Sequence, residues 1–221
     1  MKAGCERSDM VEDVLLCAIG VPEARSLAPA LEGAGVPVRL ATSVEEAVQA
    51  AHENPPGAIV ITVSGKGERR LIADSSLADW MAAADDPMFD LLALLQALKP
   101  AISGRTISIV LMGPDLGQTG ASGYTALAAA AEGQRGLMKT LARQWGPDIR
   151  FAWAGVWPPL LFPGIVAAGL PEQPELGEVT PPLGCRPGWN EVAAAVLALA
   201  ALGQAATGQS IIVDGGEWML P

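Results

Sequence analysis

One stretch of this chain, residues 123–158, limits most strongly what the chain can fold into. Apolar side chains recur in it at three- and four-residue spacing, with charged side chains between them. The apolar set is Leu127, Ala130, Ala131, Leu137, Met138, Leu141, Ala142 and Trp145, and the charged set is Glu132, Arg135, Lys139 and Arg143. This spacing predicts a helix with one buried face. Gly146-Pro147 ends it, because proline cannot continue the hydrogen-bond ladder. Residues 149–154, IRFAWA, have too few polar side chains for a surface strand, so a buried strand follows the helix.

The rest of the chain alternates predicted strands with predicted helices. Strands are expected at 13–19, 36–41, 58–63, 106–112 and 210–213, and helices at 23–32, 44–52, 77–84, 89–98 and 190–202. Ser43, with Glu46 three residues on, predicts a capping box at the start of the second helix. The alternation predicts an α/β fold, a doubly wound parallel sheet with helices on both faces. We expect residues 1–221 to form a single domain, with an irregular Pro- and Gly-rich region at 160–187.

Composition excludes several classes of protein. A net charge of −10 argues against general affinity for nucleic acid or an anionic membrane. No stretch reaches the ~18 uninterrupted apolar residues of a membrane span. The first dozen residues carry both charge signs and no apolar run, so we expect no signal peptide and a cytoplasmic protein. Cys5, Cys17 and Cys185 form neither a CxxC pair nor a zinc pattern, so reduced thiols are expected.

Two motifs carry a resemblance to a known family. They are LARQWGPDIR at 141–150 and TGQSIIVDGG at 207–216. With the order of strands and helices, they make the chain resemble the short-chain dehydrogenase/reductase family over nearly its whole length. The resemblance implies a Rossmann-like fold and NAD-dependent oxidoreductase chemistry in active members. There, a Tyr acts as acid or base, a Lys four residues on lowers its pKa, a Ser orients the substrate and an Asn anchors a water.

This chain departs from the family where the chemistry lies. With 141–150 as the reference, the Tyr position falls at Leu127 and the Lys position at Ala131. The Ser position falls at Gly113 or Pro114, and the Asn position near Pro87. None of these side chains can transfer a proton, so the alignment predicts no catalytic residues in this chain.

The turn after the first strand departs as well. Gly20 is followed by VPEARS, and no further glycine appears until Gly33. Pro22 lacks an amide that would face a phosphate, and Glu23 places a negative charge there. We therefore expect no cofactor in this chain.

Tyr124, the single tyrosine, is the one alternative acid. It stands three residues before Leu127 and has Ala128 four residues on. Arg135 and Lys139 lie eleven and fifteen residues further along the helix, too far to touch the phenol at ~1.5 Å rise per residue. A tyrosine that covers the end of the sheet is the favoured interpretation.

Three other sets of residues are candidates for a functional role. His52 is expected to be a solvated surface residue. Asp85, Asp86 and Asp90 lack a histidine or fourth carboxylate, so no metal site is predicted. Residues 66–70, KGERR, are either a solvated loop or a contact for a phosphate of a nucleotide or coenzyme A.

The resemblance also predicts subunit contacts. In the family the last strand and the late helix pack against one subunit, and the helix at 123–145 against another. Tryptophans near these elements and the apolar late helix agree with interface burial. The expected interface residues are Leu137, Leu141, Trp145, Val192, Val196, Ile211, Val213 and Trp218.

The combined prediction is a non-catalytic subunit. It would stabilise or complement an active short-chain dehydrogenase partner that binds NAD, in a heterotetramer. A CoA-thioester 3-hydroxyacyl substrate of anaerobic aromatic degradation, such as that of toluene, is what the resemblance suggests for the complex. Two alternatives stay open: an atypical enzyme that reuses the pocket, and a ligand sensor on the same fold.

Overall fold

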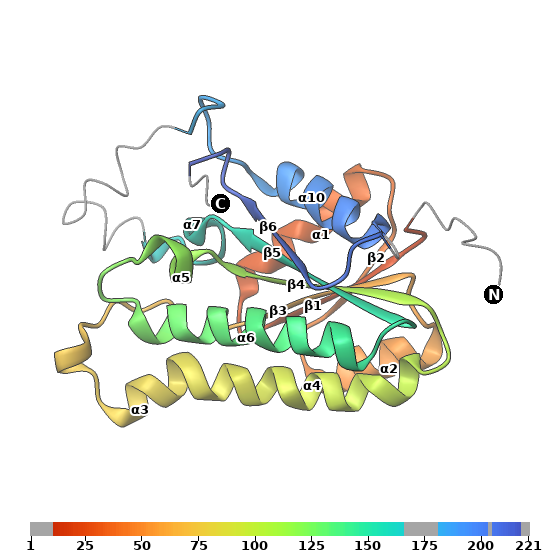
Figure 1. Ribbon diagram of the computed structural model, residues 1–221, viewed down its shortest axis with the longest axis horizontal. Coiled ribbons are helices and arrows are strands. Elements are labelled where there is room, and N and C mark those ends of the chain that lie inside the picture. The colour runs from red at the N-terminus through yellow and green to blue at the C-terminus, as the bar shows by residue number, and fades with distance from the viewer. Residues whose placement is uncertain (1–10, 166–180, 203–204, 218–221) are drawn as a thin grey trace.

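The computed structural model describes residues 11–165, 181–202 and 205–217 (Figure 1). These residues form one parallel sheet in the order β2-β1-β3-β4-β5-β6. The strands are β1 Val14–Ile19, β2 Val38–Ala41, β3 Ala58–Val63, β4 Ile107–Pro114, β5 Ile149–Val156 and β6 Gln209–Val213. The predicted doubly wound parallel sheet is confirmed.

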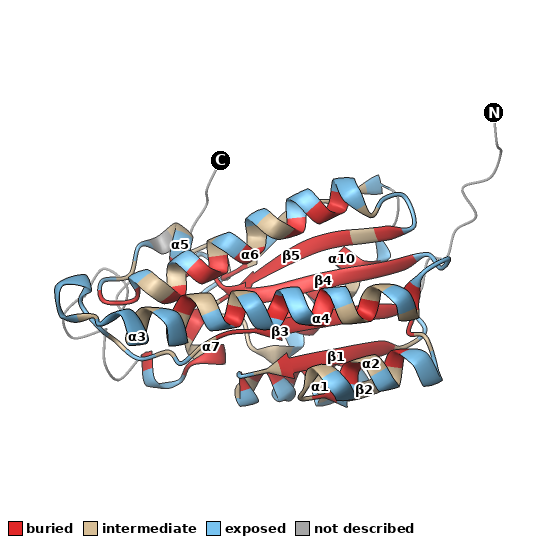
Figure 2. Ribbon diagram, turned by 90° about the horizontal axis from the view of Figure 1, so that it is seen from below, coloured by how far each residue is buried: buried red, intermediate tan, exposed pale blue. Residues whose placement is uncertain are grey.

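Helices cover both faces of the sheet. The helical segments are η1 Pro22–Ser26, α1 Leu27–Gly33, α2 Val44–Glu53, η2 Ile72–Asp74, α3 Leu77–Trp80, η3 Met81–Asp85, α4 Asp86–Ile102, α5 Leu116–Thr119, α6 Thr125–Gln144, α7 Pro158–Leu161 and α10 Trp189–Ala201. Helices α1 and α10 lie on one face, and α2, α4 and α6 on the other (Figure 1). Each face has its own core cluster, and the inner strands β1, β3, β4 and β5 are almost wholly buried (Figure 2).

The helix and strand predicted from 123–158 are confirmed as α6 and β5. The face of α6 that was predicted to be buried includes Leu127, Ala131 and Met138, each at most 3% exposed. Trp145 ends the helix with its ring 5.5 Å from that of Phe151 in β5. The predicted cap of α2 is also present, since the Ser43 hydroxyl accepts a hydrogen bond from the Glu46 amide.

One prediction of helix boundaries is wrong. The helices expected at 77–84 and 89–98 form one continuous run, in which α3 passes through the π-helical η3 into α4. The sequence Asp85-Asp86-Pro87 was interpreted as a break because proline rarely continues a helix. Pro87 is tolerated because it lies in the first turn of α4, where the π-helical segment gives way to regular helix.

Helix α10 is buried on more than one side, as its apolar sequence predicts. It packs against α1 and against β4 and β5. Only one narrow stripe, which includes Ala194 and Ala198, faces outward. No helix in the described ranges combines the length and apolar character needed to cross a bilayer.

Two buried side chains tie helices to the sheet. The Gln134 amide of α6 donates to the Val63 carbonyl at the end of β3, at 2.8 Å. The Ser108 hydroxyl of β4 donates to the Ala200 carbonyl of α10, also at 2.8 Å. The first bond holds α6 to the carboxyl end of the sheet, and the second holds α10 to the amino half on the opposite face.

We expect Gln134→Leu to lower the free energy of unfolding by about 1–3 kcal/mol, because the buried Val63 carbonyl loses its donor. The exposed Gln144→Leu on the same helix is the control and should change stability by less than about 0.5 kcal/mol. Urea unfolding of the two variants measures this difference. Equal effects would show that the buried bond contributes nothing specific.

Candidate functional site

Ligands of open parallel sheets bind outside the carboxyl ends of the strands, where the strand order reverses direction. In this chain that point lies between β1 and β3. Gly20 follows β1 with a φ of +73°, and a Cβ at this position would lie 2.4 Å from the Ser64 carbonyl oxygen. The Ser64 amide in turn donates to the Ile19 carbonyl at 3.4 Å. The backbones just after β1 and β3 therefore lie in direct contact, as a continuation of the pairing of these two strands.

The turn after Gly20 does not present a helix to this crevice in the usual manner. Residues 22–26 form the 3-10 segment η1, with Pro22 in its first turn and no side-chain cap. Helix α1 begins only at Leu27 and is seven residues long. Since phosphates bind to free amides at the start of a helix that follows the first strand, this turn lacks the usual donors. The absence of a bound dinucleotide stays a prediction, which the geometry of η1 supports.

Apolar residues also occupy the edge of the sheet above this turn. Helix α7, which follows β5, packs against η1. The Phe162 side chain lies against Gly67, where an added Cβ would be 2.6 Å from the ring. Residues from the ends of β1, β3 and β5 therefore meet over the edge where a cofactor would lie in an open sheet.

The four positions aligned with the catalytic tetrad each have a packing role. Leu127 and Ala131 belong to the two core clusters, one on each face of the sheet. Gly113 lies in β4, and a Cβ there would come within 2.6 Å of the buried Trp153 ring. Pro87 is buried in the first turn of α4. None of the four side chains is itself an acid or a base.

Tyr124 occupies the N-cap position of α6 and is 3% exposed. Its hydroxyl has no hydrogen-bond partner among the described residues. Burial raises the pKa of the phenol above its ordinary value, and the Arg69 charge offsets part of this. Arg135 is held in an ion pair with Glu132 and does not serve the phenol. Tyr124 is thus a buried core residue without an activating cation of the family type.

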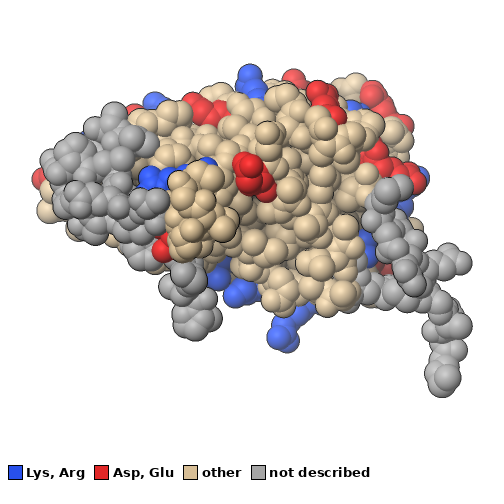
Figure 3. All heavy atoms as spheres, turned by 90° about the horizontal axis from the view of Figure 1, so that it is seen from above, with Lys and Arg blue, Asp and Glu red and all other residues tan. Residues whose placement is uncertain are grey.

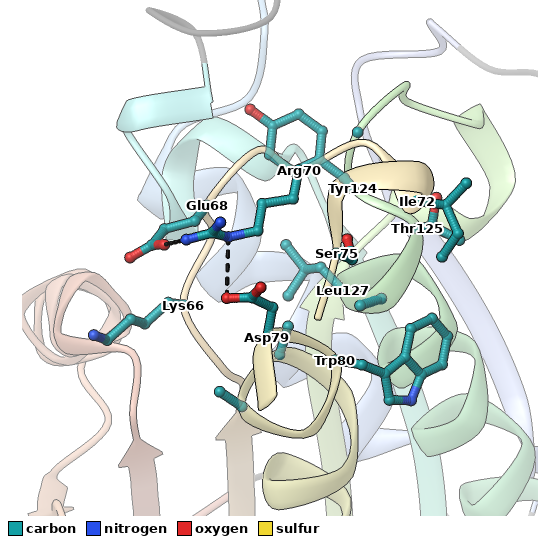
Figure 4. Close-up of a pocket in the computed structure, with 14 residues that line it drawn as sticks. Lys66, Glu68, Arg70, Ile72, Ser75, Asp79, Trp80, Tyr124, Thr125 and Leu127 are labelled. Atoms are coloured by element: carbon teal, nitrogen blue, oxygen red, sulfur yellow. Dashed lines mark ion pairs between the residues drawn. The ribbon is translucent and has the colours of Figure 1, made fainter. Parts of the chain in front are cut away.

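A cavity of about 280 Å³ lies beside the N-terminus of α6 (Figure 4). The loop at 66–75 and the π-helical η3 form much of its wall. Arg70 pairs with Glu68 at 3.5 Å and with Asp79 at 3.2 Å. Hydrogen bonds from Ser76 lower the pKa of the Asp79 carboxyl, which favours its charged form. The two acids balance Lys66 and Arg70, so the wall has no surplus of positive charge for a phosphate.

A buried acid that the sequence interpretation missed lies at the end of β4. Asp115 is 3% exposed, next to the two candidate Ser positions. Its Oδ1 atom has no hydrogen-bond partner in the described chain. Burial, followed by the charges of Asp214 and Glu217, raises the pKa of Asp115 to about 7. A charged residue directly after a buried central strand was the signal that could have identified it.

Four of the eight predicted interface residues are buried within the chain itself, and whether a partner subunit contacts the predicted faces stays a prediction. Val192 and Val196 are 0% exposed, and Leu141 and Val213 are buried in the core. Leu137 and Trp145 are half-buried beside the same cluster, Ile211 is 39% exposed, and Trp218 lies outside the described residues. Helical periodicity identified the buried faces correctly but could not tell the protein's own sheet from a partner.

The remaining candidates have surface roles. His52 is exposed on α2, as expected. Asp86 and Asp90 are exposed on α4 and Asp85 is half-buried, and the described residues contain no cluster with the composition of a metal site. Cys17 and Cys185 are free thiols, and burial raises the pKa of Cys17 to about 12.

Comparison with known proteins agrees with this fold. The sequence profile described as enoyl-(acyl carrier protein) reductase, of the short-chain dehydrogenase type, matches residues 22–217. No curated protein matches the sequence significantly. A short-chain dehydrogenase/reductase of the glucose/ribitol dehydrogenase type from Brucella melitensis superposes with a TM-score of 0.76 at 17% identity, covering 97% of this chain and all (100%) of the other.

Two further solved structures are similar. A short-chain oxidoreductase from Pseudomonas aeruginosa PAO1, described as containing an atypical catalytic center, gives a TM-score of 0.75 at 20% identity and covers 96% of this chain and 100% of its own. An oxidoreductase from Burkholderia thailandensis gives 0.71 at 19% identity and covers 94% and 93%. The fold is that of this oxidoreductase class. The chain belongs to the short-chain dehydrogenase/reductase family.

Substituting the family's serine for Gly113 tests the packing at the tetrad. We expect Gly113→Ser to lower the free energy of unfolding by about 1–3 kcal/mol, because the side chain would overlap the Trp153 ring. Gly136→Ser is the matched control, since a Cβ there meets nothing within 4 Å. Thermal and urea unfolding compare them. If Gly113→Ser were as stable as the control, the space at Gly113 would be open to a catalytic side chain.

Proposed function

We propose that this chain is a non-catalytic subunit of a mixed short-chain dehydrogenase assembly and that an active partner carries NAD and the chemistry. The observation that carries the proposal is that the four positions aligned with the catalytic tetrad are occupied by residues that pack inside the chain and cannot transfer a proton. The turn after β1, where the 3-10 segment η1 precedes the short helix α1, supports it further. A chain without its own cofactor turn and catalytic residues can still have a role if it stabilises or shapes another subunit.

The outer face of α4 and α6 supports a helical partner surface. The two helices lie side by side with their N-termini at the same end (Figure 2). The exposed positions in the part of α6 up to residue 136 are small, among them Ala129, Gly133 and Gly136. Glycine inside an exposed helix costs about 1 kcal/mol relative to alanine. Because Gly136 has nothing within 4 Å of its Cβ position, packing inside the chain does not account for it.

The apolar side chains and charges of this face are arranged so that it could pair with the corresponding α4 and α6 face of a related subunit. Phe89 is 63% exposed and Leu92 43% exposed on α4. Acidic Asp86 and Asp90 lie at the N-terminal end of the helix pair, and basic Lys139 and Arg143 are exposed toward the other end. An antiparallel two-fold pairing with a similar helix pair would set acids against bases.

The opposite face offers a second candidate surface. Seen over α1, α10 and β6, the surface carries few charged side chains (Figure 3). Strand β6 is the edge of the sheet and exposes Ile211. Helix α10 presents Ala194, Ala198 and Ala201. An uncovered edge strand and a small-residue helix are features that subunit contacts protect from water. Two such surfaces agree with the proposed heterotetramer.

The decisive experiment is purification of the tagged chain from its own host, with identification of the co-eluting protein and measurement of the native mass. The proposal expects a stoichiometric second dehydrogenase chain that has an intact glycine-rich turn and Tyr-Lys pair. NADH should quench the tryptophan fluorescence of the complex in a saturable manner. It should not do so with the isolated chain. A homo-oligomer that binds NADH or reduces a carbonyl alone would favour an atypical enzyme or a sensor. The P. aeruginosa relative with its atypical center makes that outcome a real alternative.

The outer face of α6 can be tested separately. Gly136→Arg should abolish co-purification, because a long charged side chain would stand where the partner helix approaches. Gly164→Arg, after α7 and on neither candidate surface, is the matched control, since both glycines have nothing within 4 Å of the Cβ position. Circular dichroism should show both variants folded. Equal retention of the partner by both would exclude this face as the contact.

The substrate of the assembly is the finer part of the proposal. The sequence resemblance suggests a CoA thioester of a 3-hydroxyacyl acid, as in the 2-[hydroxy(phenyl)methyl]succinyl-CoA dehydrogenase of anaerobic toluene degradation. The purified complex can be assayed with NAD and either this substrate or a simple 3-hydroxyacyl-CoA. The proposal expects faster turnover of the first. The neutral balance of charge around the cavity beside α6 gives this chain no evident phosphate contact of its own.

A further inference from the structure

Three strands end side by side at one level of the carboxyl edge. Pro114 of β4 pairs with Val156 of β5, which pairs with Val213 of β6. The next residues along these strands are Asp115, Trp157 and Asp214. Because neighbouring strands lie roughly 4.8 Å apart, the two aspartates flank the tryptophan. The Asp115 amide donates to the Val156 carbonyl at 3.2 Å and so extends the ladder.

The charged groups around this row are buried. Asp115 is 3% exposed, Asp214 4%, and the Glu217 side chain 4%. Arg186 donates to both carboxylate oxygens of Glu217, at 3.0 Å each, and its guanidinium lies 4.7 Å above the Trp157 ring. The ion pair of Arg186 and Glu217 thus lies against the same tryptophan that the two aspartates flank.

Other elements against Asp115 bring little further charge. The described parts of α5 and α7 contain no titratable side chain. Helix α6 contributes the ion pair of Glu132 and Arg135, which neutralise each other beside Gly117 of α5. The Asp214 Oδ1 atom accepts the Gly216 amide at 2.8 Å. Asp115 is the member of the cluster for whose Oδ1 no donor is present in the described chain.

The cluster also joins two segments that are distant in sequence. A Cβ added to Gly215 would lie 3.0 Å from the Cys185 carbonyl oxygen and 3.0 Å from the Pro181 side chain. Residues 181–187 therefore pack directly on the turn after β6, and Arg186 in that segment binds Glu217 beyond the turn. The same segment leads into α10 at Trp189.

We propose that Asp115, Asp214, Glu217 and Arg186 form a pH-sensitive latch, which holds residues 181–187 against the end of β6 while Asp115 is protonated. When Asp115 gives its proton to water, a further negative charge is buried near the carboxyl groups of Asp214 and Glu217, which oppose it. Repulsion and the cost of burying that charge then loosen the latch. The inference does not depend on the function proposed above.

The direction of the pH effect follows from proton linkage. The pKa of Asp115 is about 7 in the folded chain, against about 3.9 for an unperturbed aspartic acid. Between these values the folded chain binds a proton that the unfolded chain does not. Stability therefore falls as the pH rises through this range, and the contribution of the proton is lost above about pH 7.

Asp115→Asn tests the latch, because an amide has the shape of the protonated acid and cannot ionise. The wild-type melting temperature should fall from pH 5.5 to 8.5, whereas the variant should lose most of that slope and be the more stable at the upper end. Asp148→Asn, at an exposed aspartate, is the matched control and should keep the wild-type slope. Hydrogen exchange at Gly184 and Gly216, corrected for the intrinsic rate, should rise with pH in the wild type alone.

Two further measurements keep the inference falsifiable if Asp115→Asn fails to fold. Carboxyl ¹³C NMR of the wild type should show Asp115 titrating near neutral pH, and titration near pH 4 would overturn the latch. Asp214→Asn should move that titration to lower pH, because one of the charges that oppose ionisation is removed. An unchanged midpoint, or equal pH slopes in wild type and Asp115→Asn, would also refute the proposal.

Discussion

At the carboxyl edge of the sheet, backbone segments touch one another at glycines, because no side chain would fit between them. Gly20, at a positive φ, touches the Ser64 carbonyl, and Gly65 lies against the backbone of η3, where a Cβ would be 2.3 Å from the Ala82 oxygen. Gly67 is covered by the Phe162 ring. These contacts hold the segments that follow β1, β3 and β5 together at the carboxyl edge.

The positions aligned with the family's catalytic tetrad take part in the packing of this chain. Leu127 and Ala131 belong to the cores on the two faces, and Gly113 makes room for Trp153. A larger side chain at Gly113 would have to displace that ring. The buried charges lie further along the carboxyl edge, where Asp115 and Asp214 follow β4 and β6 and Arg186 pairs with Glu217.

The two outer layers differ from the core in what they leave uncovered. The stripe of small residues on α6 and the exposed Phe89 and Leu92 on α4 lie on one side of the sheet. The edge strand β6 and the alanines of α10 lie on the other. Surfaces of this kind gain stability from a second chain, because apolar area is removed from water without loss of hydrogen bonds.

The sequence by itself determined the class of fold. Period-two and period-3.6 patterns reflect which side of an element is buried, so α6, β5 and a parallel sheet with helices on both faces were predictable. That Leu127 and Ala131 leave the chain without catalytic residues stays a prediction. The run through η3 into α4 was not, because the context of Pro87 overrides its local preference.

Only the tertiary structure decided what covers each buried face and which distant residues meet. Val192 and Val196 pack on the protein's own sheet, although their pattern suits a subunit contact equally well. Asp115, Arg186 and Glu217 are far apart in the chain and meet because parallel strands align their carboxyl ends. Burial and charge at such a site depend on strand order and register, and these arise from packing of the whole chain rather than from any local pattern.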